Sequence, residues 1–121
     1  METNQTDWSA LDALTLRQRR ADLVGSLPSL EHLMHGSLIA RYTHCGKPNC
    51  HCKTGKGHGP HWYLSFLGPQ GHTRLEYVPT ALAPLVKEQI DRHHDVERIL
   101  AQVAEINREL LRRRDPDEFP A

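Results

Sequence analysis

The residues with the clearest chemical potential are three cysteines and one histidine in a short glycine-rich stretch. Cys45, Cys50, Cys52 and His58 follow the spacing C-x4-C-x-C-x5-H, and the chain has 3 cysteines in total. Three thiolates and one imidazole complete the tetrahedral ligand set of a structural zinc ion. The sequence therefore predicts one Zn²⁺ held by these four side chains.

Other chemistry is conceivable for the same stretch. His44, His51 and His61 are rival fourth ligands, but His58 is favoured because the glycines beside it free its backbone, whereas His61 is expected at the start of a strand. An iron–sulfur cluster ordinarily takes four thiolates, so the 3 cysteines of this chain disfavour one. Three clustered cysteines also fit a metal site better than a secretory disulfide framework.

The charge of the chain is balanced overall but unevenly distributed. Lys and Arg number 15, Asp and Glu number 15, and residues 32–75 contain no Asp or Glu. The basic side chains of that stretch are Arg41, Lys47, Lys53, Lys56 and Arg74. Such a patch suits a phosphate backbone or an acidic partner, and an ordinary solvated basic surface is the alternative.

These residues must be positioned by a small α+β fold. A helix is expected over residues 7–24, with Asp7 or Ser9 as its cap. Alternation of apolar and polar residues predicts strands over 37–43, 61–67 and 73–78, arranged as a three-stranded antiparallel meander. The zinc loop joins the first two strands, so residues 37–78 form a zinc-stabilised β core. With 38% hydrophobic residues, the core is small and the metal is expected to contribute to folding.

A long helix is expected over residues 83–114. Pro84 fits the first turn of a helix, so residues 80–82 are expected to form only a preceding turn. The helix carries an apolar seam with coiled-coil spacing: Val96, Ile99, Val103, Ile106 and Leu110. The helix over 7–24 or, in a weak homodimer, a second chain would cover this seam. Residues 115–121 are expected to be frayed, and residues 1–121 to form a single domain.

One family resemblance follows from the motif. The quoted residues are Gly36-Ser37-Leu38, Arg41-Tyr42, Cys45-Gly46-Lys47-Pro48-Asn49-Cys50-His51-Cys52, His58-Gly59-Pro60 and Tyr77-Val78-Pro79. Over residues 36–110 the chain resembles an uncharacterised bacterial family, a domain of unknown function with the signature GSL…RY…CGKPxCxC…HGPY…YVP. His61 stands where the signature has Tyr. Members of that family often occur near mobile elements, so the resemblance implies nucleic-acid work by association.

The first functional hypothesis is a non-catalytic, zinc-binding accessory protein of a mobile element that binds DNA or RNA. Arg41, Lys47, Lys53, Lys56 and Arg74 would meet phosphates, while Tyr63 stacks on a base and Trp62 packs in the core. The alternatives are a protein-interaction adaptor that uses the long helix, and a hydrolase or nuclease subunit. No signal peptide or membrane span is visible, so we expect a cytoplasmic protein.

Overall fold

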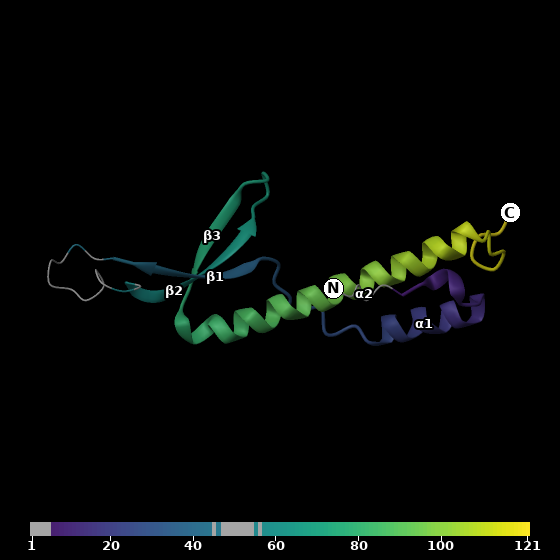
Figure 1. Ribbon diagram of the computed structural model, residues 1–121, viewed down its shortest axis with the longest axis horizontal. Helices are drawn as coiled ribbons and strands as arrows, with labels where there is room; N and C mark the ends of the chain where they lie inside the picture. The colour runs from purple at the N-terminus through teal and green to yellow at the C-terminus, as the bar shows by residue number, and fades with distance from the viewer. Residues whose placement is uncertain (1–5, 45, 47–54, 56) are drawn as a thin grey trace. The chain divides into compact units, whose positions relative to one another are not determined.

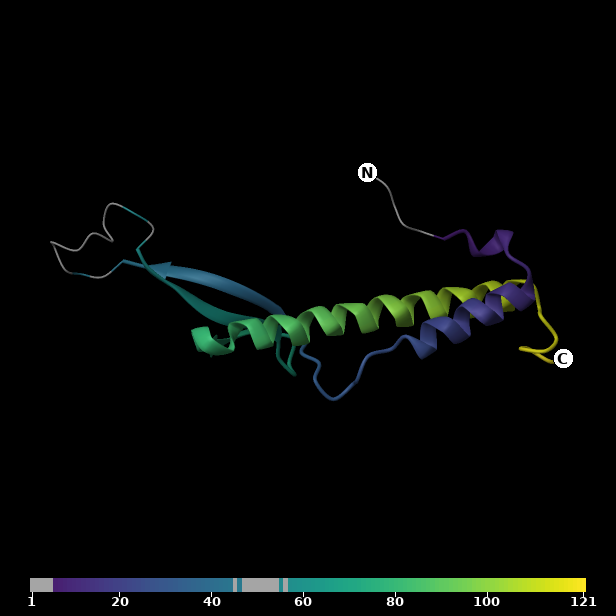
Figure 2. The ribbon, with the colours of Figure 1, turned by 90° about the horizontal axis from the view of Figure 1, so that it is seen from below.

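A computed structural model describes residues 6–44, 46, 55 and 57–121. The elements run in the order η1 (Trp8–Ala10), α1 (Ala13–Gly25), β1 (Ser37–Thr43), β2 (His58–Leu67), β3 (Thr73–Val78), η3 (Thr80–Leu82) and α2 (Ala83–Arg112). Figures 1 and 2 show this succession of helix, sheet and long helix along the colour gradient. The fold is therefore α+β, as the sequence predicts.

The chain divides into two compact units. The sheet unit comprises residues 31–93 and the helical unit comprises residues 1–30 and 94–121. The long helix α2 contributes residues to both of them. Each unit has its own cluster of buried apolar side chains.

The sheet unit is built on a three-stranded antiparallel sheet in the order β1-β2-β3. β1 and β3 have the predicted bounds, but β2 begins three residues earlier than expected, at His58. The reason is a register shift: Arg41 pairs with His61, and pairing resumes where Thr43 faces His58. The ladder therefore continues across Gly59 and Pro60 to the end of the loop.

One face of the sheet is covered by the first turns of α2. Leu64 and Val78 from the sheet form one buried cluster with Ala83 and Ile90 of the helix. The half-buried residues that pack against the cluster are Met34, Leu38, Trp62, Phe66 and Val86. Trp62 thus packs in the core, as expected, and burial of this apolar surface holds the helix against the strands.

The helical unit departs from the expected helix over residues 7–24. Asp12 caps α1, its carboxylate accepting a hydrogen bond from the backbone N–H of Thr15 at 2.9 Å. Asp7 instead caps the short 3-10 helix η1, where its carboxylate accepts from the N–H of Ser9 at 3.2 Å. The helix is interrupted between them because the backbone at Leu11 is extended, and Asp12 provides a fresh helix start.

The apolar seam of α2 is largely buried inside the chain. Ile106 and Leu110 are 0% exposed and form a cluster with Leu16 of α1, which is also 0% exposed. Val96 and Ile99 are buried as well. Trp8, Leu11, Ala13 and Leu23 pack around the cluster. At Ile106 and Leu110 the seam is covered by the chain's own N-terminal segment, which is one of the two arrangements that the sequence allows.

The bounds of α2 agree closely with the prediction from Pro84. A 3-10 turn over Thr80–Leu82 precedes the helix, which begins at Ala83 and ends at Arg112, two residues before the expected end. Among the described residues, no helix is both long and apolar enough to cross a bilayer.

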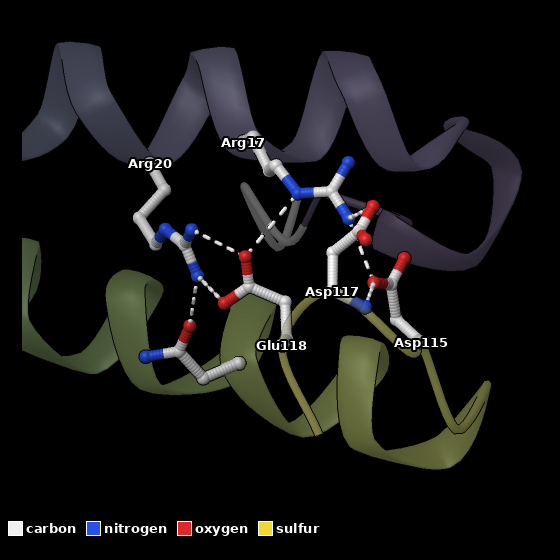
Figure 3. A network of polar contacts seen from close by, with 6 residues as sticks. Arg17, Arg20, Asp115, Asp117 and Glu118 are labelled. Carbon is white, nitrogen blue, oxygen red and sulfur yellow. Dashed lines mark hydrogen bonds and ion pairs between the residues drawn. The ribbon is translucent and has the colours of Figure 1, made fainter. Parts of the chain in front are cut away.

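The prediction of a frayed tail after α2 is wrong. Arg114 adopts a positive φ of 52°, and the chain turns so that the N–H of Asp115 donates to the carbonyl of Leu110 at 3.1 Å. Figure 3 shows the result: Arg17 and Arg20 of α1 point at the carboxylates of the tail. Arg17 lies 2.7 Å from Asp115 and 3.2 Å from Glu118, while Arg20 lies 2.8 Å from Glu118.

This polar network also affects acid–base behaviour. Hydrogen bonds from Arg20 and then from Arg17 lower the pKa of Glu118 from its ordinary 4.5 to about 2. The same contacts raise the pKa of both guanidinium groups. Opposite charges favour each other's ionised forms, so the ion pairs that hold the tail to α1 persist at neutral pH.

Candidate metal centre

The predicted zinc ligands belong to the loop between β1 and β2. Cys45, Cys50 and Cys52 lie outside the described residues, whereas His58 is described and is half-buried at the first position of β2. Its partner across the ladder is Thr43, the last residue of β1. The two strands therefore meet at the base of the loop, and the histidine stands at that base.

The two glycines that flank His58 permit this close approach of β2 to β1. Gly57 has a φ of 97°, and a Cβ atom there would lie 2.5 Å from the carbonyl oxygen of Thr43. Gly59 has a φ of 139°, and a Cβ atom there would lie 2.7 Å from the carbonyl oxygen of Arg41. A side chain at either position would clash with the backbone of β1. The glycines therefore let this end of β2 lie close against β1.

The rival histidines that the structure describes occupy different positions. The ring of His44 lies beside Gly57, since a Cβ built on that glycine would be 3.4 Å from its Cε1 atom, so His44 is also at the base of the loop. His61 is paired with Arg41 inside the ladder. Within the described part of the chain, no three His, Cys, Asp or Glu side chains gather as a metal site, but the cysteines are not among those residues.

The predicted nucleic-acid residues are separated by the fold. Lys47, Lys53 and Lys56 lie outside the described residues. Arg41 and Tyr63 come together on one face of the sheet, with the guanidinium carbon 5.7 Å from the ring centroid. This distance is typical of a cation–π contact.

Arg74 is not part of that arrangement. It pairs with Phe66, and therefore shares a face with Phe66 of the core rather than with Tyr63. Phe66 lies eight positions beyond His58, which corresponds to about 26 Å of extended strand. Arg74 is therefore remote from the base of the β1–β2 loop and lies beside the β2–β3 turn, where its side chain is close to Gly68.

Tyr77 is a residue that the sequence analysis placed on β3 but did not assign to a site. It pairs directly with Tyr63, and the two rings lie 5.8 Å apart in an edge-to-face arrangement with an interplanar angle of 72°. The signal was available, because the short turn at Gly68-Pro69-Gln70-Gly71 fixes the cross-strand partners of the hairpin.

Comparisons with known proteins assign the chain to a family. A family model described as "Domain of unknown function (DUF6788)" matches residues 14–88. Because this is more than half of the chain, the protein belongs to that family. The match begins in α1 and ends in the first turns of α2, whereas the motif suggested a resemblance over 36–110. No curated protein matches the chain, and no solved structure matches it either.

Proposed function

We propose that the protein is a non-catalytic, zinc-binding accessory protein of a mobile element, and that it binds nucleic acid. Its metal ligands would be Cys45, Cys50, Cys52 and His58. The observation that carries the metal part is the ladder end at Thr43 and His58, which brings together the two ends of the loop with the cysteines.

The zinc proposal is consistent with the local geometry. Cys45 follows Thr43 by two residues, so covalent geometry keeps its Cα within about 7.6 Å of the Cα of Thr43. His58 faces Thr43 across the ladder. The first and last proposed ligands are therefore tethered to the same end of the sheet. A bound zinc would supply structural cross-linking there, and closing a loop in this way offsets the entropy of the open chain.

The nucleic-acid proposal depends on charge and on the exposed sheet face. Residues 32–75 carry five basic side chains and no carboxylate. Three of the basic residues, Lys47, Lys53 and Lys56, belong to the same loop as the cysteines. Arg41 adjoins the loop on β1 and is exposed. A metal-fixed loop of lysines is a suitable way to position cations against phosphates.

The alternatives have weaker support. An adaptor that docks through the α2 seam would have to displace α1, because Ile106 and Leu110 are fully buried against Leu16. A hydrolase or nuclease subunit would need an acid or base beside an open metal position. The acid-free stretch around the loop offers histidines alone for that task.

The metal part of the proposal is tested by elemental analysis of protein purified without chelator. We expect about one zinc per chain, since the ligands fit one tetrahedral site. Cys52→Ser and His58→Asn should lose zinc, whereas His72→Asn, in the turn at the other end of the sheet, should keep it. Zinc-free parent protein, or a zinc-loaded Cys52→Ser variant, would refute the site.

The nucleic-acid part is tested by the salt dependence of binding to labelled oligonucleotides. Replacing Lys47, Lys53 and Lys56 with Gln should reduce the slope of log K against log salt by roughly two to three units, at just under one unit per phosphate contact. A matched control replaces Lys87, Arg98 and Arg108, three exposed cations of α2, with Gln. Parent protein without salt-dependent binding, or equal effects of the two triple variants, would contradict the proposal.

A further inference from the structure

The sheet has a second face, opposite the one that α2 covers. Pairing and strand alternation place ten residues on it: Ser37, Ile39, Arg41, His61, Tyr63, Ser65, Leu67, Thr73, Leu75 and Tyr77. We call this the open face. None of the ten belongs to a buried apolar cluster of the described chain. Leu75 is 43% exposed and Tyr77 is 56% exposed, so large side chains stand in solvent there.

Aromatic rings form the centre of the open face. Tyr63 on the middle strand lies between Tyr77, its direct partner on β3, and the guanidinium of Arg41 on β1. The three side chains thus extend across the whole sheet. Neighbouring strands lie about 4.8 Å apart, so the row is about 10 Å wide.

The electrostatics of the open face favour an anionic partner. None of its ten residues is acidic, and Arg41 adds a positive charge. The nearest carboxylate along β3 is Glu76, which alternates to the opposite face with Leu64 as its partner. The strands that carry Arg41 and His61 lead directly into the lysine-containing loop. A phosphate chain across the face would therefore meet Arg41 near the end of β1.

The rings of Tyr63 and Tyr77 favour a single-stranded nucleic acid over a duplex. In a duplex the base faces are already stacked, and a protein contacts phosphates and groove edges instead. In a single strand the base faces are available, and exposed aromatic side chains on a sheet can stack against them with little regard to sequence. A surface that exposes Tyr77 beside Tyr63 therefore fits unpaired bases.

We propose that the open face binds single-stranded nucleic acid, with bases stacked on Tyr77 and Tyr63 and phosphates near Arg41. The inference rests on the proposed nucleic-acid function and specifies its substrate class. Cross-strand aromatic pairs also stabilise hairpins. A role of Tyr63 and Tyr77 in sheet stability alone is therefore the alternative that the test must separate from binding.

The test compares Tyr77→Leu with Tyr42→Leu by fluorescence anisotropy. Both tyrosines are exposed, Tyr77 by 56% and Tyr42 by 42%, but Tyr42 neighbours Arg41 on β1 and alternates to the other face. The probes are a labelled 12-nucleotide oligo-dT, a 12-nucleotide oligo-U and a duplex of the same length. We expect the parent to prefer the single strands, and Tyr77→Leu to weaken that binding roughly tenfold to hundredfold. Tyr42→Leu should leave it unchanged.

The outcomes separate this inference from the proposed function. The salt slope of Tyr77→Leu should stay at the parent value, because no phosphate contact is removed. Duplex preference, or single-strand affinity unaffected by Tyr77→Leu, would overturn the inference while salt-dependent binding still upholds the proposed function. Absence of any binding by the parent would overturn both. Unchanged tryptophan fluorescence and an unchanged thermal midpoint show that a variant is folded.

Discussion

Truncation of Ile106 to Ala is the most direct test of how the α2 seam is buried. Ile106 is 0% exposed and packs with Leu16 of α1 and Leu110 of its own helix. Removing a fully buried Ile side chain leaves a cavity and costs about 2–5 kcal/mol. Ala is the better helix former, so a loss of stability cannot come from helix propensity.

The expected change is large relative to the stability of the helical unit. A unit of roughly 60 residues has a free energy of unfolding of about 3–9 kcal/mol. A loss of about 3 kcal/mol corresponds to a fall in Tm of roughly 12–24 °C for a unit of that size. Leu100→Ala is the matched control, since Leu100 lies on the same helix but is 55% exposed, and its effect should stay within about 0.5 kcal/mol.

The assay can report on one unit at a time because the chain has 2 tryptophans. Trp8 packs against the cluster of the helical unit and donates a hydrogen bond to Glu105 at 2.8 Å, while Trp62 packs in the sheet unit. A Trp62→Phe background leaves Trp8 as the sole indole reporter of thermal unfolding. Equal midpoints for Ile106→Ala and Leu100→Ala would refute the packing. If light scattering gave the Ile106→Ala variant half the mass of the parent, a second chain would instead cover the seam.

Two further predictions concern the tail and the loop. Because the pKa of Glu118 falls from 4.5 to about 2 on folding, its contribution to stability is complete above pH 4.5, declines as pH falls below 4.5, and is lost near pH 2. Trp8-monitored unfolding at pH 6 and pH 3 should show this decline, and Glu118→Gln should reduce it; an equal decline in the variant would contradict the role of the ion pairs. Gly57→Ala should release zinc at lower chelator concentration than the parent, because its Cβ would lie 2.5 Å from the carbonyl oxygen of Thr43. Gly55→Ala, where a Cβ meets nothing within 4 Å, should match the parent, and identical release by both variants would remove the glycine argument.

Local patterns were sufficient to predict most of the elements. Alternation gave the bounds of β1 and β3, and Pro84 correctly placed the start of α2 at residue 83. The break before α1 was missed because Trp8 and Leu11 satisfy helical spacing, whereas the extended backbone at Leu11 reflects the separate caps at Asp7 and Asp12.

Long-range contacts explain what the sequence could not show. Residues 115–121 are polar and proline-containing, which is typical of a frayed end. Their order comes from Arg17 and Arg20, about a hundred positions earlier in the chain. The position of Arg41 is a second example, because only the register between β1 and β2 shows that it shares a face with Tyr63. By contrast, the hairpin turn already pairs Tyr77 with Tyr63, and alternation sets Arg74 on the other face.

Because α2 contributes to both units, the segment that matches the family model and the segment that is needed for folding end at different residues. The family match ends at residue 88, ahead of Ile90 in the sheet unit and of Ile106 and Leu110 in the helical unit. Yet it includes α1, whose Leu16 is buried by those last two residues. A chain trimmed to 14–88 would leave Leu16 in water and remove one member of the sheet core. The segment that defines the family is therefore shorter than the segment required to bury its own apolar side chains.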